Sequence, residues 1–177
     1  FLAAASERSD GWIPLGAGRG AADTELYYRG LGGALRWTPQ LGDQQLAVRL
    51  SGYQEKRGAG LVGADSRATG ATFSATLVDQ PEGEGEGWRL QGWVKRSDFE
   101  NRSAAVAAGR NTTTPASEQY ATPATGYGLN AALRRDAADG GWEGGADARL
   151  FDGETREKFR YMAGAFTRDR VAGGTQS

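Results

Sequence analysis

The sequence has no cysteine and no histidine among its 177 residues. Without cysteine the chain has no disulfide, no thiolate nucleophile and no cysteine metal ligand, and without histidine it lacks the usual general base and the commonest ligand of transition metals. Carboxylate and serine-lysine chemistry remain, but no convincing constellation of such residues is present. We therefore expect a protein that is not an enzyme and that has no catalytic residues, no bound metal and no cofactor.

The sequence also lacks a long apolar run and a strong charge of one sign. No stretch approaches the ~18 consecutive apolar residues that a membrane-spanning helix requires. The net charge of −1 gives no basic stripe, so we expect no nucleic-acid partner. Three acidic residues, Glu82, Glu84 and Glu86, alternate with glycine in a short segment that lacks the oxygen order of a calcium loop, which favours solvated charge there.

What the sequence does contain is strict alternation of apolar and polar side chains. In residues 88–95 one set is Trp88, Leu90, Gly92 and Val94, and the other is Arg89, Gln91, Trp93 and Lys95. The same period of two recurs in residues 45–52, 70–78 and 126–134. Successive side chains of a strand point to opposite sides of a sheet, so the pattern predicts an all-β protein with one apolar and one polar face. A soluble sandwich would alternate in the same way.

The length of the segments and the order of their connections favour a membrane. We predict antiparallel up-and-down strands near residues 1–6, 25–37, 44–55, 68–79, 88–98, 121–135, 142–152 and 158–168. All but the first of these reach or exceed the roughly 9 to 11 residues of a tilted spanning strand. The predicted connections alternate between long (7–24, 56–67, 99–120) and short (38–43, 80–87, 136–141). Outer-membrane barrels have longer external loops and short periplasmic turns.

Three tryptophans, Trp37, Trp88 and Trp142, each flank one of the short connections. Aromatic rings form girdles at the headgroup level of membrane barrels, so the three predict a single rim. The alternative is that large aromatic residues at strand ends enter a core, because aromatics are favoured in strands generally.

Specific segments resemble a known family. Residues 88–135 (WRLQGWVKRSDFENRSAAVAAGRNTTTPASEQYATPATGYGLNAALRR), together with ASERSDGWIPL, RATGATFSATL, GGADARLFDGETREKFR and RDRVAGG, resemble the barrel wall of TonB-dependent outer-membrane receptors of alphaproteobacterial type. The resemblance implies a large transmembrane β-barrel of 22 strands that encloses an amino-terminal plug. It also implies import of a scarce nutrient (a ferric siderophore, cobalamin or a carbohydrate) across the outer membrane of a Gram-negative bacterium, with energy from the TonB complex.

The resemblance places residues 1–177 within the barrel, as an arc of about seven or eight strands. The sequence begins with Phe1 rather than methionine and shows neither a plug nor a TonB-contacting segment, so we interpret it as an internal piece of a longer chain. The expected partners are outer-membrane lipid, the plug and the TonB complex outside these residues, and a small-molecule or metal-chelate substrate.

Two sets of site residues follow from this interpretation. Charged and polar residues of the alternating segments are expected to face the lumen, where they contact the plug or a solute, or are merely hydrated: Arg49, Arg89, Gln91, Lys95, Asn130, Arg134, Asp147 and Arg149. The longest predicted connection, 99–120, is expected to select the ligand through Thr113, Glu118, Gln119 and Tyr120.

Two alternatives remain open at this point. The first is a soluble β-sandwich that serves as a binding or adhesion module, in which the apolar faces of two sheets meet. The second is a β-rich hydrolase, which needs two carboxylates about 5 to 9.5 Å apart in a cleft. Glu143 with Asp147, or Asp152 with Glu154, are the pairs that such an enzyme would use.

Overall fold

The computed structural model of this protein describes residues 1–79 and 85–177, which form one antiparallel sheet of ten strands and no helix. The strands are β1 (Leu2–Ser9), β2 (Tyr28–Trp37), β3 (Gln40–Leu41), β4 (Gln44–Leu61), β5 (Ala64–Asp79), β6 (Gly85–Val106), β7 (Thr113–Ala121), β8 (Ala124–Ala137), β9 (Gly140–Met162) and β10 (Ala165–Gln176). Among these residues there is accordingly no helix with the length and apolarity to cross a membrane. The prediction of an all-β, antiparallel fold is confirmed.

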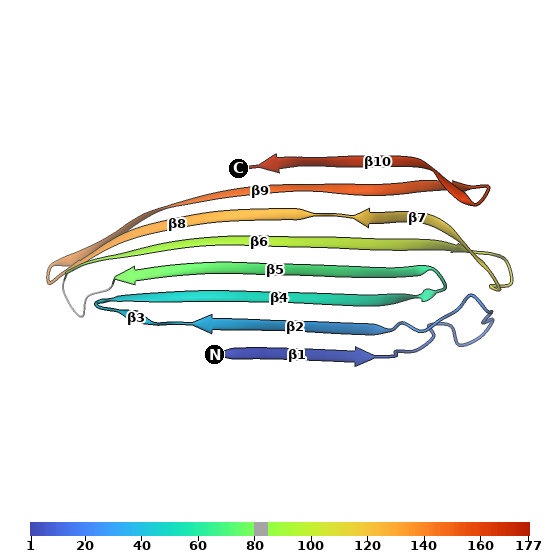
Figure 1. The fold of residues 1–177 in the computed structure, drawn as a ribbon, viewed down its shortest axis with the longest axis horizontal. Helices are drawn as coiled ribbons and strands as arrows, with labels where there is room; N and C mark the ends of the chain where they lie inside the picture. Colours follow the sequence, from blue (N-terminus) through green and yellow to red (C-terminus); the bar gives the residue numbers. More distant parts are fainter. Residues whose placement is uncertain (80–84) are drawn as a thin grey trace.

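The strands run up and down, each beside its neighbour in the sequence (Figure 1). Strands β7 and β8 occupy one position in the sheet, because the long strands β6 and β9 flank both of them. The short strand β3 likewise pairs with β4 just beyond the end of β2. The ten strands therefore fill eight positions, which agrees with the eight predicted from the sequence.

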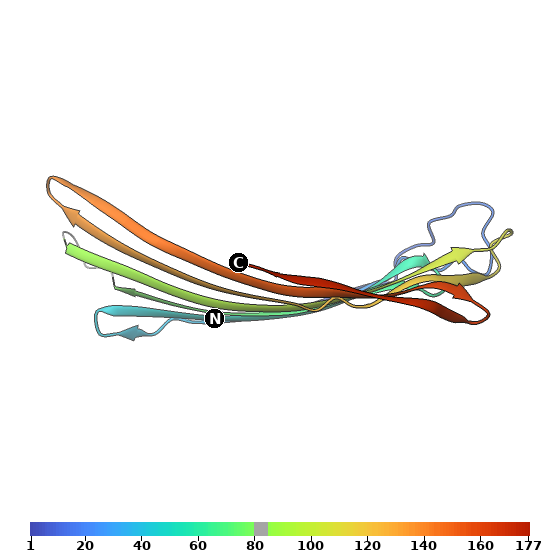
Figure 2. The same ribbon diagram turned by 90° about the horizontal axis from the view of Figure 1, so that it is seen from above.

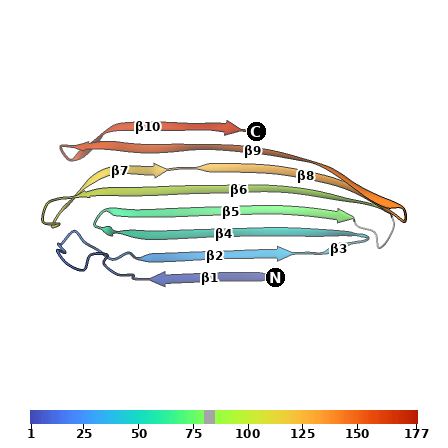
Figure 3. The same cartoon turned by 180° about the vertical axis from the view of Figure 1, so that it is seen from behind.

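The sheet is a single layer. Seen edge-on, it is a curved and twisted ribbon, and neither face is covered by another element (Figures 1, 2 and 3). Among the described residues the buried ones are Ala22, Asp23, Gly60, Ala64 and Gly126, and no large side chain is fully buried. A β-sandwich requires two sheets with facing apolar sides, and the described residues supply only one.

Several strands extend well beyond the predicted bounds. Strands β4, β5, β6 and β9 have 18, 16, 22 and 23 residues. Strand β9 runs continuously through residues 153–157, where the sequence predicted a connection. The hairpin between β9 and β10 instead turns at Ala163 and Gly164, which both have positive φ (52° and 87°) as a tight two-residue hairpin requires.

The strict alternation of long and short connections was wrong. The first connection, 10–27, is long, but the predicted long segment 56–67 reduces to a two-residue turn at 62–63, and 99–120 reduces to residues 107–112. Residues 80–84, which include Glu82 and Glu84 and most of the predicted short connection 80–87, lie outside the described residues. Loop length therefore does not separate the two ends of the sheet.

Candidate functional site

The two faces of the sheet differ sharply. Residues paired across antiparallel strands point to the same face, and one such row runs Leu2, Leu35, Leu50, Phe73, Val94, Tyr127 and Leu150 across seven strands. Alternate positions on either side of this row continue the apolar band over seven to nine residues of most strands. We call this band the apolar belt: Leu2, Ala4, Leu31, Gly33, Leu35, Trp37, Leu46, Val48, Leu50, Gly52, Ala71, Phe73, Ala75, Leu77, Trp88, Leu90, Gly92, Val94, Tyr127, Leu129, Ala131, Leu133, Trp142, Gly144, Ala146, Ala148 and Leu150.

The apolar belt has no protein layer against it. Leu50, Leu90 and Leu129 are 50%, 44% and 54% exposed, and the two tryptophans at its edge, Trp37 and Trp142, are 59% and 56% exposed. Soluble monomers rarely expose apolar patches larger than a few hundred Å². A belt that crosses seven strand positions needs a covering phase that these residues do not supply.

The apolar belt slopes across the sheet. The row of Trp37 passes through Val48, Ala75, Gly92 and Leu129 to Ala148 on β9. Trp142, which ends the belt on β9, lies six residues (148 − 142) beyond that row. Six residues at ~3.4 Å each correspond to a shift of about 20 Å along the strands. The five strand spacings from β2 to β9, at ~4.8 Å each, correspond to about 24 Å across the sheet. This edge of the belt is therefore inclined by about 40° to the perpendicular of the strands.

The opposite edge of the belt slopes in the same direction. On β2 the belt reaches Leu31, whereas on β9 it stops at Leu150, which belongs to the row of Leu35. The shift of four residues (35 − 31) over the same five spacings corresponds to about 30°. If the strands were tilted by about 30° to 40° from the normal of a flat apolar layer, both edges of the belt would run roughly parallel to the surfaces of that layer. Trp37, Trp88 and Trp142 would then lie along one rim.

The eight predicted lumen residues share the other face, which we call the polar face. The row Arg49, Ser74, Trp93, Gly128, Arg149 crosses it, and so does the row Gln91, Asn130, Asp147. Arg89, Lys95 and Arg134 lie at alternate positions of the same strands. The structure therefore brings all eight residues to one side of the sheet. Whether that side encloses a lumen stays a prediction.

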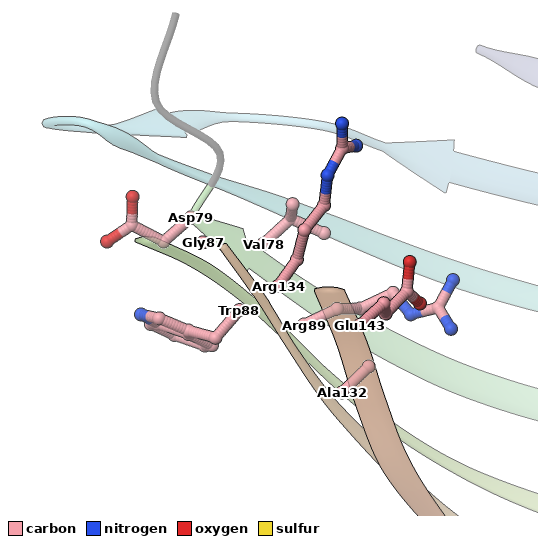
Figure 4. A pocket seen from close by; sticks show the side chains of 8 residues that line it. All are labelled: Val78, Asp79, Gly87, Trp88, Arg89, Ala132, Arg134 and Glu143. Carbon is pink, nitrogen blue, oxygen red and sulfur yellow. The ribbon is translucent and has the colours of Figure 1, made fainter. Parts of the chain in front are cut away.

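Short-range hydrogen bonds and ion pairs link several of these residues. Arg89 donates to Oδ1 of Asn130 at 3.3 Å, and the Asn130 amide donates to the Ala146 carbonyl at 3.4 Å. Arg149 pairs with Asp147 at 2.6 Å, and Arg134 pairs with Asp136 at 2.7 Å. Figure 4 shows a shallow hollow at one end of the sheet, where Arg89, Arg134 and Glu143 extend away from Asp79 and Trp88.

The polar face also holds large aromatic rings that lie over glycines. Trp93 covers Gly128 so closely that a Cβ there would lie 2.1 Å from the indole Nε1. Phe151 covers Gly126 and packs against Trp93 with ring centroids 5.9 Å apart. Glycine is required at these positions because the ring occupies the space of a side chain on the neighbouring strand. The sequence shows the alternation but not these pairings.

An ordered cluster that the sequence does not predict lies at the end of the sheet that carries connections 10–27, 62–63 and 107–112. Connection 10–27 folds back on the turns at 62–63 and 107–112, and both nitrogens of the Arg110 guanidinium that face Asp23 donate to its carboxylate, Nε at 3.0 Å to each oxygen. The Gly20 amide donates to the same carboxylate at 2.9 Å. The Arg110 hydrogen bond, aided by that of Gly20, lowers the pKa of Asp23 to about 2. We call this cluster the loop clasp.

No sequence signal predicts the loop clasp, because its two charged residues lie 87 positions apart. Backbone hydrogen bonds reinforce it. The Ala22 amide donates to the Arg110 carbonyl and the Val62 amide donates to the Ala22 carbonyl, both at 2.9 Å. The clasp contains Ala22 and Asp23, two of the five buried residues of the described part of the chain, so it fixes the shape of the longest connection.

The predicted ligand-selecting residues do not lie in a loop. Thr113, Glu118, Gln119 and Tyr120 all belong to strand β7. They are also divided between the faces, because Glu118 accepts a hydrogen bond from Arg102 at 3.0 Å while its neighbour Gln119 points to the opposite side. The Tyr120 ring lies under the Lys158 ammonium at 5.0 Å. The structure therefore does not gather these four residues into one site.

Of the carboxylate pairs considered for a hydrolase, one is too widely spaced, and the other, Asp152 with Glu154, lies two residues apart (~7 Å) on β9 with both carboxylates engaged by neighbouring side chains. Glu143 and Asp147 are four residues apart on β9, which corresponds to ~13 Å along a strand. Asp152 accepts a hydrogen bond from the Thr175 hydroxyl at 2.9 Å, and Glu154 accepts one from Arg156 at 2.7 Å. Within residues 1–79 and 85–177, no three acidic side chains gather as a metal site would require.

The structure thus offers three features on which a function can depend: the sloping apolar belt, the polar face and the loop clasp. Comparison with known proteins identifies no relative of this chain. No known family model, curated protein or solved structure matches the chain.

Proposed function

We propose that this chain forms part of the wall of a large transmembrane β-barrel, the barrel of a TonB-dependent receptor in the outer membrane of a Gram-negative bacterium. The observation that carries the proposal is the exposed, sloping apolar belt. Strands of membrane barrels are tilted by about 35° to 45°, and the lipid-facing band is about 25 Å tall. The inclinations of about 40° and 30° at the two edges of the belt agree with a tilted wall.

The open edges of the sheet support a larger barrel. Among the described residues the sheet does not close on itself, because β1 pairs only with β2 and β10 pairs only with β9. Unpaired backbone groups in hydrocarbon cost several kcal/mol each, so a membrane strand requires pairing on both sides. Further strands of the receptor would supply it.

The polar face takes the role of the lumen wall in this proposal. An arginine on the lipid face near the midplane costs about 2 to 4 kcal/mol, and Arg49, Arg89 and Arg149 all lie on the face opposite the belt. These cations would contact the plug or an anionic solute such as a ferric siderophore. The loop clasp would then lie at the external end, with the tryptophan rim at the periplasmic end.

Membrane fractionation tests the proposal directly. The full-length chain is expected to sediment with outer membranes, resist extraction with carbonate and float with phosphatidylcholine vesicles after refolding. A chain that remains monomeric in buffer without detergent, and does not float, contradicts the proposal.

Transport is tested separately in cells. Arg89→Ala with Arg149→Ala is expected to reduce uptake of the receptor's nutrient, measured for ferric siderophores, cobalamin and carbohydrates in turn, without loss of the protein from the membrane. Arg168→Ala, a change on the same face outside the lumen set, is the matched control. Uptake that is unchanged in the double variant contradicts a role of these cations in transport.

A further inference from the structure

A row of four cations crosses the belt face just beyond the edge of the apolar belt. Arg8 pairs with Arg29, Arg29 with Lys56, and Lys56 with Arg67, so the four side chains lie side by side on β1, β2, β4 and β5. We call them the cation row. All four residues are exposed. Their row spans three strand spacings, about 14 Å.

The cation row has little internal compensation. Arg8 pairs with Asp10 at 3.3 Å, but no ion pair of Arg29, Lys56 or Arg67 occurs in the described part of the chain. Arg67 faces Glu100 in the register without an ion pair, and Arg29 has only the Tyr27 ring at 5.9 Å. Like charges directly opposite each other destabilise a sheet, so this arrangement calls for an anion from outside.

The rest of the same edge is balanced in charge. On β6 and β7, Arg102 lies 3.0 Å from Glu118 and 3.8 Å from Asp65, and on β9 Arg156 pairs with Glu154. Long cations at a membrane edge commonly reach toward the headgroups one by one. A run of four cations on adjacent strands, of which only Arg8 has an ion pair among the described residues, is different, because it concentrates positive charge at one place on the edge.

We propose that the cation row binds the phosphate of a membrane lipid whose acyl chains lie on the apolar belt. Guanidinium groups match phosphate oxygens in a bidentate geometry, and a lysine adds a point charge. Leu31 is two residues from Arg29 on β2, and Ala71 is four residues from Arg67 on β5, so the cations lie about 7 to 14 Å beyond the belt. A phosphate there and hydrocarbon below it fit one amphiphile. The inference depends on the proposed function, since it requires the belt face to contact lipid.

The test measures binding of a phosphate-monoester lipid to the full-length chain in a zwitterionic detergent. Fluorescent phosphatidic acid is the probe, and diacylglycerol and inorganic phosphate are the competitors. The test variant carries Arg29→Gln, Lys56→Gln and Arg67→Gln. The matched control carries Arg36→Gln, Arg57→Gln and Arg168→Gln, which remove equal charge from the polar face outside the predicted lumen residues.

The test variant is expected to raise the Kd for phosphatidic acid about 100-fold, since each basic residue near an anionic surface contributes about fivefold. The control variant is expected to change the Kd less than threefold, and neither competitor is expected to displace the lipid at equal concentration. Unchanged affinity in the test variant overturns the inference, and displacement by inorganic phosphate alone reduces the row to a simple anion site and also overturns it.

Vesicle flotation separates this inference from the proposed function. Both triple variants are expected to float with phosphatidylcholine vesicles as the original chain does. If the chain floats but the test variant binds phosphatidic acid normally, only the lipid site is refuted. If the chain does not float, the membrane proposal itself fails.

Discussion

Arginine placed in the middle of the apolar belt is the most informative perturbation. Leu90 lies between Trp88 and Val94 on β6, is 44% exposed, and contacts no second protein layer. In a bilayer, Leu90→Arg would carry a cation near the midplane at a cost of about 2 to 4 kcal/mol. This corresponds to a folded-to-unfolded ratio lowered roughly 30- to 1,000-fold, because each 1.4 kcal/mol is a factor of ten. On a water-exposed surface the same change stays within about 0.5 kcal/mol.

The adjacent residue provides the matched control. Gln91 lies on the polar face, one position along the same strand. Gln91→Arg therefore adds the same charge at nearly the same height along the strand, but on the face that the proposal exposes to water. The assay is guanidinium unfolding of the full-length protein in phosphatidylcholine vesicles, followed by tryptophan fluorescence, to which residues 1–177 contribute five tryptophans. A cost below about 0.5 kcal/mol for Leu90→Arg, or an equal cost for both variants, would refute the assignment of the two faces.

Three further predictions follow from the contacts. Gly128→Ala is expected to destabilise the fold by about 1 to 3 kcal/mol, since the new Cβ meets Trp93 Nε1 at 2.1 Å, whereas Gly92→Ala, with its nearest atom at 4.0 Å, is expected to cost less in the same unfolding assay. Asp23→Asn is expected to open connection 10–27, read as faster amide exchange at Ala22, with Asp10→Asn as the exposed control. Because the pKa of Asp23 falls from 3.8 to about 2 in the folded chain, the clasp is fully stabilised above about pH 4 and loses that stabilisation as the pH falls toward 2. The protection of the Ala22 amide, taken relative to the intrinsic exchange rate at the same pH, should therefore decrease in that window, and protection that stays constant there would contradict the ion pair.

The sequence predicted the fold where one face of the strands is apolar and the other polar. Within the belt, the alternation assigned Leu46, Leu90 and Leu129 to one face and the cations to the opposite face, as the structure has them, and a slip of one residue would have exchanged the two faces completely. Beyond the belt both faces carry polar side chains, so segments such as 56–67 and 99–112 show no alternation although backbone pairing continues through much of them. Strand ends were therefore predicted too early, and connections too long.

The loop clasp could not be predicted for a different reason. It depends on contact between Asp23 and Arg110 across two turns whose positions were predicted incorrectly. Arg110 also adopts a positive φ of 56°, which is not expected for an arginine. The pairing of Trp93 with Gly128 also needs the register of two strands rather than the pattern of one. Long-range register is the information that a single sequence lacks.

The central claim is that the belt face of this sheet contacts hydrocarbon and the polar face contacts water. A spin-label scan tests it most directly, because the chain has no native cysteine and each of positions 88–95 can carry a single one. In membranes, nitroxides at positions 88, 90, 92 and 94 are expected to collide with oxygen, and those at 89, 91, 93 and 95 with a water-soluble nickel chelate. Nickel accessibility at the even positions equal to that at the odd positions would contradict the account.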